Sequence, residues 1–298
     1  MSAPLRIAIA GLGTVGAGTL AVLAKNAELI RARSGRPLAV TAVSARDRAR
    51  DRGTPLAGVT WYDDPVRMAR EAEVEVVVEL IGGSDGVAKA VIEAALARGR
   101  HVVTANKALL AVHGAELALE AERAGVALSY EGAVAGGIPI VKALRESLAA
   151  NRIERVYGIL NGTCNYILTD MRRNAREFAA ALADAQRLGY AEADPSFDVD
   201  GVDAAHKLAI LASLAFGTKV DFGGVYMEGI RHVSPRDIAF AEELGYRIKL
   251  VGSARLTAHG LEQRVHPCMV ALDNPLAHVE GVLNAVVAKG DFAETTEY

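Results

Sequence analysis

One strongly apolar helical segment carries an acid and a lysine at its start. Almost every residue from 204 to 216 is apolar, yet Asp203 and Lys207 stand at the entrance. Residues four apart share one face of a helix, and here that face continues with Ile210 and Leu214. A surface ion pair is the ordinary interpretation of this spacing, but a helix that is apolar all round is a buried one. A lysine in such a place suits proton transfer, because removal from water favours its neutral form.

Five acidic residues lead into this helix: Glu192, Asp194, Asp198, Asp200 and Asp203. Clustered carboxylates bind either a metal ion or an ammonium group of a ligand. The spacing lacks the alternation and the glycine of an EF-hand loop, so an amino group is the partner that we favour. The alternative is an acidic surface loop in which Asp200 caps the helix.

Three glycines near the start of the chain have the G-x-G-x-x-G spacing. They follow the strand-like segment "RIAIAG" and open a helix-like one. The first glycine permits a tight turn, the second lets backbone approach a pyrophosphate, and the third lets helix and strand pack closely. In this context the loop predicts dinucleotide binding, and the alternative is a tight turn without a ligand. The predicted cofactor-binding residues here are Gly11, Leu12, Gly13, Thr14, Val15 and Gly16.

The end of the second predicted strand bears on which dinucleotide binds. NAD sites usually carry an acid there, whereas this chain has Ser44, Ala45 and Arg46. The planar fork of Arg46 can pair with a 2′-phosphate, although an arginine run at 46, 48 and 50 can also be a solvated surface. We favour NADP, with NAD as the alternative. A nicotinamide cofactor, a lysine and ammonium-binding carboxylates together suggest oxidation of an amino-alcohol or reduction of an amino-aldehyde.

Strand-like and helix-like segments alternate through the first half of the chain. Strands are predicted at 6–11, 38–44, 74–82, 101–106 and 126–132, and helices at 17–33, 85–99 and 113–125. This alternation predicts a doubly wound parallel sheet of Rossmann type. Later segments favour a more antiparallel sheet, with strands at 152–160, 247–256 and 261–272 and helices at 176–189, 203–211 and 234–245. We predict an α/β Rossmann domain over 1–136 and an α+β substrate and dimerisation domain over 137–298.

Composition excludes several classes of protein. The net charge of −3 gives no electrostatic reason to bind nucleic acid or an anionic membrane. The uncharged stretch 7–24 is long enough for a membrane span, but its four glycines fit a strand, a turn and a helix better. The two cysteines have neither metal-ligand spacing nor a disulfide framework, so we expect a reducing, cytoplasmic setting.

Six stretches of the chain resemble homoserine dehydrogenase. They are "GLGTVG", "TANK", "YEGAVAGGIPIV", "NGTCNYIL", "GYAEADPSFDVDGVDAAHKLAIL" and "GVYMEGI", in that order over nearly the whole chain. The resemblance implies an oxidoreductase that interconverts L-homoserine and L-aspartate 4-semialdehyde with NAD(P), in threonine, methionine and isoleucine biosynthesis. It also implies a homodimer that binds neither nucleic acid nor a membrane.

The resemblance further implies roles for single residues. Lys207 would move the proton at the substrate oxygen, with Asp203 placing both it and the substrate. Lys107 would be a second catalytic lysine that also contacts the cofactor. Glu192 and Asp198 would hold the substrate ammonium, and "NGTCNY" would form a loop bridging the domains over the substrate.

A sodium ion is also implied, held mainly by backbone carbonyl groups. The matching positions are Glu131, Val134, Gly136 and Ile138. Carbonyl sites leave little side-chain signature, so the residues alone fit equally well a glycine-rich turn that joins two domains.

The resemblance breaks at "VVAKGDFAETTEY". Members of this family continue with a glycine-rich "GAG" segment that contacts the cofactor, and some carry an ACT domain. We therefore expect no feedback inhibition through an ACT domain. Two alternatives stay open: another Rossmann amino-acid oxidoreductase such as an aspartate dehydrogenase, and an NADP-binding but inactive truncated homologue. The first alternative leaves the carboxylate-rich approach to Lys207 unexplained.

Overall fold

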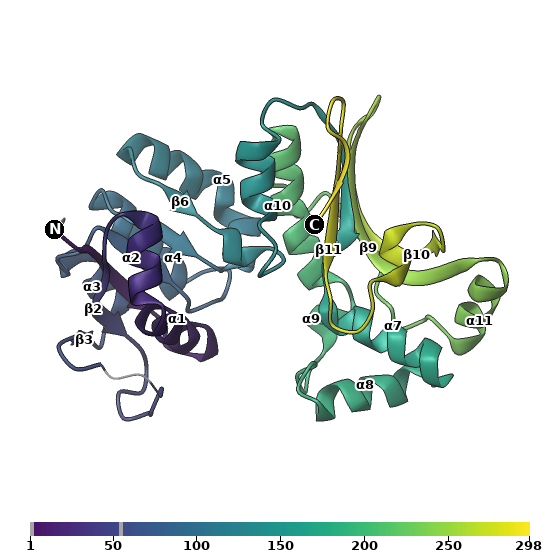
Figure 1. Ribbon diagram of the computed structural model, residues 1–298, viewed down its shortest axis with the longest axis horizontal. Helices are drawn as coiled ribbons and strands as arrows, with labels where there is room; N and C mark the ends of the chain where they lie inside the picture. Colours follow the sequence, from purple (N-terminus) through teal and green to yellow (C-terminus); the bar gives the residue numbers. More distant parts are fainter. Residues whose placement is uncertain (1–2, 54–55) are drawn as a thin grey trace. The chain divides into compact units, whose positions relative to one another are not determined.

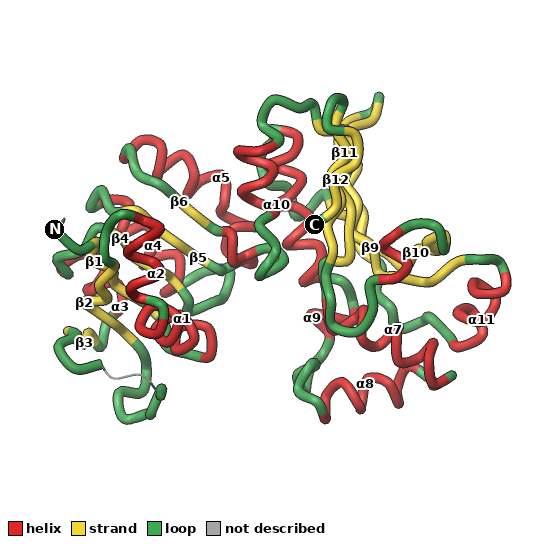
Figure 2. Tube along the Cα trace, viewed as in Figure 1, coloured by secondary structure: helices red, strands yellow, loops and turns green. Residues whose placement is uncertain are grey.

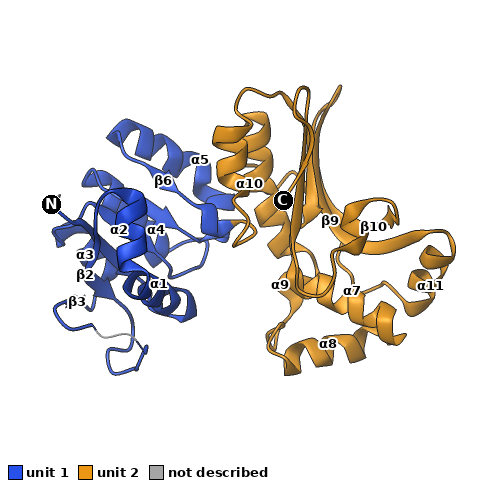
Figure 3. Ribbon diagram, viewed as in Figure 1, with its two compact units in different colours: residues 1–133 blue, residues 134–298 orange. Residues whose placement is uncertain are grey.

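A computed structural model of the chain describes residues 3–53 and 56–298 (Figure 1). It divides into unit 1, residues 1–133, and unit 2, residues 134–298, which Figure 3 shows in blue and orange. Each unit is built around one six-stranded sheet.

The sheet of unit 1 is parallel throughout, with the order β3-β2-β1-β4-β5-β6. This is the doubly wound order of dinucleotide-binding folds, so the predicted fold class is confirmed. All four residues of β4 are buried, as expected for a strand that is covered on both faces. The strands are β1 (Leu5–Ala10), β2 (Leu38–Ser44), β3 (Thr60–Tyr62), β4 (Val76–Glu79), β5 (His101–Thr104) and β6 (Leu128–Ser129).

The helices of unit 1 differ from the predicted ones in three places. The single helix expected over 17–33 is two helices, because the backbone leaves helical geometry at Asn26 (φ −107°, ψ 21°). The prediction missed β3 and α3, although Asp64 and Pro65 form a standard helix start. The helix expected from 113 begins six residues earlier, at Lys107. The helices are α1 (Thr14–Lys25), α2 (Ala27–Ser34), α3 (Pro65–Glu71), α4 (Val87–Ala97), α5 (Lys107–Ala124) and the 3₁₀ turn η1 (Glu131–Ala133).

The sheet of unit 2 has the order β12-β11-β7-β9-β10-β8 and is antiparallel except for the β8–β10 pair. This confirms the more antiparallel second sheet. Figure 2 shows its strands in yellow, with β9 and β10 forming one long hairpin. The strands are β7 (Ile153–Ile159), β8 (Val225–Met227), β9 (Tyr246–Thr257), β10 (Gly260–Ala271), β11 (Ala285–Gly290) and β12 (Glu294–Glu297).

The helix that carries Lys207 packs across β7, β9 and β10. Nine of its residues are buried, as the sequence predicted for a helix without a polar face. It starts after Gly201 and ends before Gly217, both left-handed (φ 87° and 63°). The helices of unit 2 are α6 (Ile140–Lys142), η2 (Ala143–Ser147), α7 (Gly162–Asn174), α8 (Phe178–Arg187), α9 (Ser196–Val199), α10 (Val202–Phe216), α11 (Pro235–Glu243) and η3 (Pro275–His278).

The uncharged stretch near the N-terminus is divided between β1, a glycine turn and nearly all of α1. Over residues 3–53 and 56–298, we find no helix with both the length and the apolar character that crossing a membrane requires.

Candidate active site

The glycine loop of unit 1 is tightly packed at two of its three glycines. Gly11 is left-handed (φ 96°), and a Cβ there would lie 2.5 Å from the carbonyl oxygen of Leu80. A Cβ on Gly16 would lie 2.0 Å from the carbonyl oxygen of Gly11. Gly13, by contrast, has no atom within 4 Å of where its Cβ would be. The loop therefore needs glycine for its turn and for helix packing, and it leaves open space at the middle glycine.

The middle glycine of the loop is also the N-cap residue of α1. Gly13 precedes the first helical residue and has no side chain to accept a hydrogen bond from the first amide groups. Such a helix start attracts anions, because exposed N–H groups and the helix dipole point at the ligand. Leu12 is buried and anchors the loop, while Val15 is 59% exposed. The loop therefore fits the pyrophosphate of a dinucleotide.

Two arginines of the run after β2 contact neighbouring parts of unit 1. Arg46 is exposed just beyond the strand end. Arg52 donates from Nε to the carbonyl oxygen of Leu12 at 3.3 Å, so it ties this run to the glycine loop. The guanidinium groups of Arg48 and Arg52 lie 5.8 and 5.4 Å from the ring centre of Trp61. Sequence reasoning missed Arg52, whose contact is to a backbone oxygen.

A fully buried acid closes the carboxyl end of β4. Glu79 is 0% exposed. Its Oε1 accepts from the amide groups of Ile81 at 2.7 Å and Gly82 at 3.1 Å, and its Oε2 accepts from the Thr104 hydroxyl at 2.6 Å. Glu79 therefore joins the loop after β4 to the end of β5, at the edge where doubly wound folds bind their ligands.

The same network sets the start of α5. The Thr104 hydroxyl accepts from the amide of Asn106 at 3.0 Å. Asn106 then caps the helix by accepting from the amide of Leu109 at 3.1 Å, and it donates to the carbonyl oxygen of Gly83 at 2.8 Å. Lys107 is therefore the first residue of α5 and stands at this strand edge.

In unit 2 the acid and lysine predicted to pair do so. Lys207 Nζ lies 2.7 Å from Asp203 Oδ2, and the two side chains are 15% and 5% exposed. Lys207 also donates to the carbonyl oxygen of Leu160 at 2.8 Å. Two partners at short range offset the cost of removing an ammonium group from water.

Asn161 connects this pair to a second carboxylate. Its Nδ2 donates to Asp203 Oδ2 and to Asp198 Oδ1, both at 2.8 Å. Its Oδ1 accepts from the amide of Cys164 at 2.8 Å, which makes Asn161 the cap of α7. The prediction of a loop for "NGTCNY" is therefore wrong, because the cap starts a helix at Gly162.

The remaining acids of the cluster have different surroundings. Asp194 accepts from the amide of Ser196 at 3.1 Å, and hydrogen bonds from Ser196 lower the pKa of that carboxyl. Asp200 pairs with Arg231, and Gly201 occupies the cap position of α10, so the alternative of Asp200 as that cap is wrong. Glu192 is exposed.

A buried thiol is hydrogen-bonded to the backbone of one of these acidic residues. Cys164 is fully buried and donates from Sγ to the carbonyl oxygen of Asp198 at 3.2 Å. Burial, followed by the negative charges of Asp198 and Asp203, raises the pKa of the Cys164 thiol well above its ordinary value. Cys164 is therefore a protonated packing group and not a nucleophile.

The four positions of the predicted sodium site span a tight backbone turn. Ala135 (φ 45°) and Gly137 (φ 97°) are left-handed, and the amide of Ile138 donates to the carbonyl oxygen of Ala135 at 2.9 Å. Carbonyl oxygens are suitable ligands for a hard cation. The predicted positions lie in and after η1: Glu131, Val134, Gly136 and Ile138.

Unit 1 has the fold and glycine loop of a dinucleotide-binding domain, and unit 2 holds a lysine within a carboxylate-rich centre. These features are those of an NAD(P)-dependent oxidoreductase. Residues 11–131 match the model "Homoserine dehydrogenase, NAD binding domain", and residues 139–298 match "Homoserine dehydrogenase". The chain belongs to the homoserine dehydrogenase family, whose members act on a CH–OH group.

Individual relatives agree with this family. A homoserine dehydrogenase of Pseudomonas aeruginosa is 50% identical over 295 residues, which is 99% of this chain and 67% of that protein. The crystal structure of one from Thiobacillus denitrificans superposes with a TM-score of 0.95 at 48% identity, over 99% of this chain and 68% of that one. A hyperthermophilic archaeal homoserine dehydrogenase in complex with NADPH gives a TM-score of 0.82 at 27% identity, over 99% and 90% of the two chains. The chain thus spans about two thirds of the first two relatives.

Proposed function

We propose that this chain interconverts L-homoserine and L-aspartate 4-semialdehyde, with residues 1–136 binding NAD(P) and residues 137–298 binding the amino acid. The observation that supports this most is the buried Asp203–Lys207 pair, which Asn161 links to Asp198. It offers a proton-transferring amine beside carboxylates that can bind an ammonium group.

In the oxidation direction the bound nicotinamide supplies the hydride acceptor. The amino group of Lys207 moves the proton that leaves the substrate hydroxyl. Asp203 and the Leu160 carbonyl group orient that amine, since both accept its hydrogen bonds. Asp198 and Glu192 bind the substrate ammonium. Lys107 acts from the strand edge of unit 1, where Asn106 fixes the start of its helix.

The test is homoserine-dependent formation of NADPH by the 298-residue chain and by Lys207→Ala. We expect activity in the parent and a loss of about 10²–10⁴-fold in the variant, the usual contribution of a positioned acid or base. Lys289→Ala is the matched control, because Lys289 is 54% exposed on β11 and pairs with Glu154. An inactive parent would refute the proposed activity, and a fully active Lys207→Ala would remove Lys207 from its role.

We propose NADP as the preferred cofactor. Exposed Arg46 lies just past β2, and Arg52 ties the following arginine run to the glycine loop. A planar guanidinium group suits a 2′-phosphate, which NAD lacks. The NADPH named for the archaeal relative is consistent with this preference.

We propose sodium binding at the carbonyl groups of the 131–138 segment. The donor type supports a hard cation, and the family resemblance supports sodium. Thermal unfolding in NaCl and in choline chloride of equal ionic strength tests it. We expect a higher Tm in NaCl that saturates with concentration. An equal Tm in both salts would contradict the site.

We propose a homodimer formed through unit 2, in a reducing cytoplasmic setting. Strands of its sheet carry large exposed apolar side chains, among them Tyr226, Leu256 and Met269. Both cysteines are free thiols, which is consistent with a reducing compartment. Sedimentation equilibrium of the parent and of Leu256→Glu tests the assembly, with a shift toward monomer expected in the variant.

A further inference from the structure

Residues 279–283 run along α7, and we call this segment the strap. A Cβ on Gly162 would lie 2.5 Å from the carbonyl oxygen of Val282, so the helix start touches the strap backbone directly. One turn further, Asn165 is 1% exposed and donates from Nδ2 to two carbonyl oxygens of the strap. These belong to Val279, at 3.1 Å, and Leu283, at 3.2 Å.

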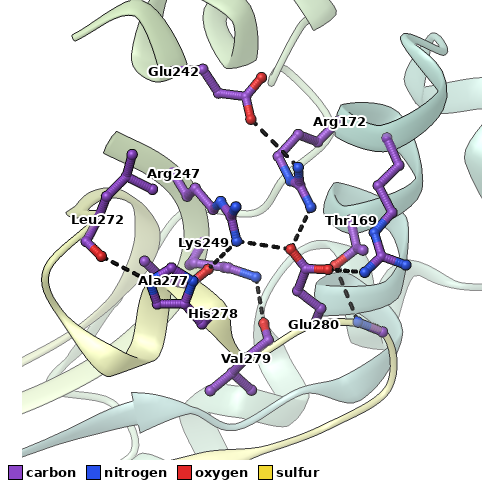
Figure 4. Close-up of polar contacts among 12 residues, drawn as sticks. Thr169, Arg172, Glu242, Arg247, Lys249, Leu272, Ala277, His278, Val279 and Glu280 are labelled. Carbon is purple, nitrogen blue, oxygen red and sulfur yellow. Dashed lines mark hydrogen bonds and ion pairs between the residues drawn. The ribbon is translucent and has the colours of Figure 1, made fainter. Parts of the chain in front are cut away.

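A buried lysine binds the helix and the strap together. Lys249 comes from β9 and is 3% exposed. Its Nζ donates to Asn165 Oδ1 at 3.0 Å and to the carbonyl oxygen of Val279. Figure 4 shows the Lys249 ammonium group directed at Val279. The side-chain amide of Asn165 therefore accepts a hydrogen bond from Lys249 at its oxygen and donates hydrogen bonds to the strap from its nitrogen.

The middle of the strap is fixed by a separate set of contacts. Glu280 pairs with Arg172 from α7 and with Arg247 from β9, the latter at 2.8 Å (Figure 4). The amide of Gly281 donates to the Thr169 hydroxyl at 3.2 Å. The strap therefore contacts α7 at several points along its length.

The contacts of Gly162 and Asn165 bear on the first turn of α7, and its cap is Asn161. The Asn161 amide group must reach Asp198 and Asp203 at once, each at 2.8 Å. An error of about 1 Å in such a group can cost about 10²-fold in rate. The hydrogen bonds of Lys249 go to Asn165 and Val279 rather than to these carboxylates. Burying its charge is costly, and an apolar residue of similar size would fill the same space at lower cost.

We propose that Lys249 and Asn165 are positioning residues of the reaction centre, which seat the first turn of α7 so that Asn161 meets both carboxylates. This proposal rests on the proposed function. Lys249 and Asn165 would then affect the turnover of the substrate without touching it.

The test compares Asn165→Leu and Lys249→Met with the parent. We expect kcat for homoserine to fall about 100-fold in Asn165→Leu and about 10-fold in Lys249→Met, which leaves Asn165 its two strap contacts. The KM for the nucleotide should not change, because its loop lies in unit 1. Hydrogen exchange of residues 162–168 should be faster in both variants, and Lys249→Arg should recover part of kcat.

Matched controls separate positioning from general damage. Ser234→Ala removes the side-chain cap of a different helix of unit 2, α11, and Lys289→Met removes an exposed lysine of the same sheet. Unchanged kcat or unchanged exchange in both test variants would overturn the proposal, as would equal losses in the controls. If Asn165→Leu does not fold, Lys249→Met decides together with Thr169→Val. If the parent is inactive, the proposed function fails, and the exchange data alone decide whether Lys249 and Asn165 seat the helix.

Discussion

Lys207 and Asn161 share one acceptor: Oδ2 of Asp203 lies 2.7 Å from Lys207 Nζ and 2.8 Å from Asn161 Nδ2. The oxygen is buried, so both donors depend on it. A change at any of the three residues alters the environment of the other two. The first two predictions follow from this sharing.

Removing Asp203 alone should be far more destabilising than removing it together with Lys207. Asp203→Leu leaves an ammonium group inside an apolar helix, and breaking a buried pair in this way costs about 3–5 kcal/mol. Adding Lys207→Met should recover most of that loss, since two apolar side chains then pack together. Urea unfolding of the parent, both single variants and the double variant measures the coupling. Simple additivity of the two single effects would contradict a buried pair.

The exposed pair Arg67–Glu71 has the same four-residue spacing and serves as the control. Its side chains are 67% and 52% exposed. Alanine at either position, or at both, should change the unfolding free energy by less than about 1 kcal/mol.

Asn161→Asp should convert a shared donor into a third carboxylate. Three like charges repel, so we expect kcat at neutral pH to fall about 100-fold and to recover partly at lower pH, where one of them gains a proton. Asn161→Ala loses the cap, worth about 1 kcal/mol of stability, and should show no recovery on acidification. The pH profiles of kcat for both variants measure this difference.

The three glycines of the loop should respond differently to alanine. Gly13→Ala enters open space at an ordinary φ of −72° but is a poorer helix cap, so Tm should fall by only a few °C while the Kd for NADPH rises at least about 10-fold. Gly16→Ala meets a carbonyl oxygen at 2.0 Å and should lower both Tm and binding. Gly18→Ala, also in open space but farther into α1, should leave NADPH affinity unchanged. Fluorescence titration and thermal melts separate the three outcomes.

Arg46→Ala should weaken NADPH and spare NADH. Loss of a charge-assisted contact to a phosphate corresponds to about 10–100-fold in Kd. Arg50→Ala, another exposed arginine of the same run, is the control. Titration of both cofactors with both variants measures the preference, and equal losses for NADH and NADPH would contradict a 2′-phosphate contact.

The buried Lys249 should make stability rise with pH in the alkaline range. Burial lowers the pKa of Lys249 to about 8 from 10.5, so between these values the unfolded chain binds more protons than the folded one. The free energy of unfolding should therefore increase from about pH 8 to pH 10.5, by about 3 kcal/mol, and be flat below pH 8 for this group. The difference in unfolding free energy between the parent and Lys249→Met, measured at pH 7, 8, 9 and 10, isolates the effect. A difference that is constant over this range would contradict it.

Sequence reasoning reached the features that leave a periodic or spacing signal. The parallel sheet follows from alternating apolar segments, and the Asp203–Lys207 pair follows from helical spacing on an apolar helix. Family resemblance was needed to name a substrate, because an ammonium-binding cluster alone fits many amino acids.

The missed parts depend on contacts between distant positions. The Leu160 carbonyl group binds Lys207 without any side-chain signal. Glu79 did leave one, an acid at the end of a buried apolar strand, but only the structure shows its bond to Thr104. The family resemblance implied a loop at "NGTCNY", and only the structure shows that Asn161 caps a helix that begins at Gly162.

The packing of Gly162 against Val282 also sets an order of events during synthesis. Asn165 binds Leu283 across 118 positions of the chain. At ribosomal speeds of about 5–20 residues per second, roughly 6–24 s pass between the emergence of these two residues. During that interval the nascent helix lacks the backbone that covers its first turn. The Asp203–Lys207 centre of unit 2 is therefore completed only after most of the sheet beneath it has been made.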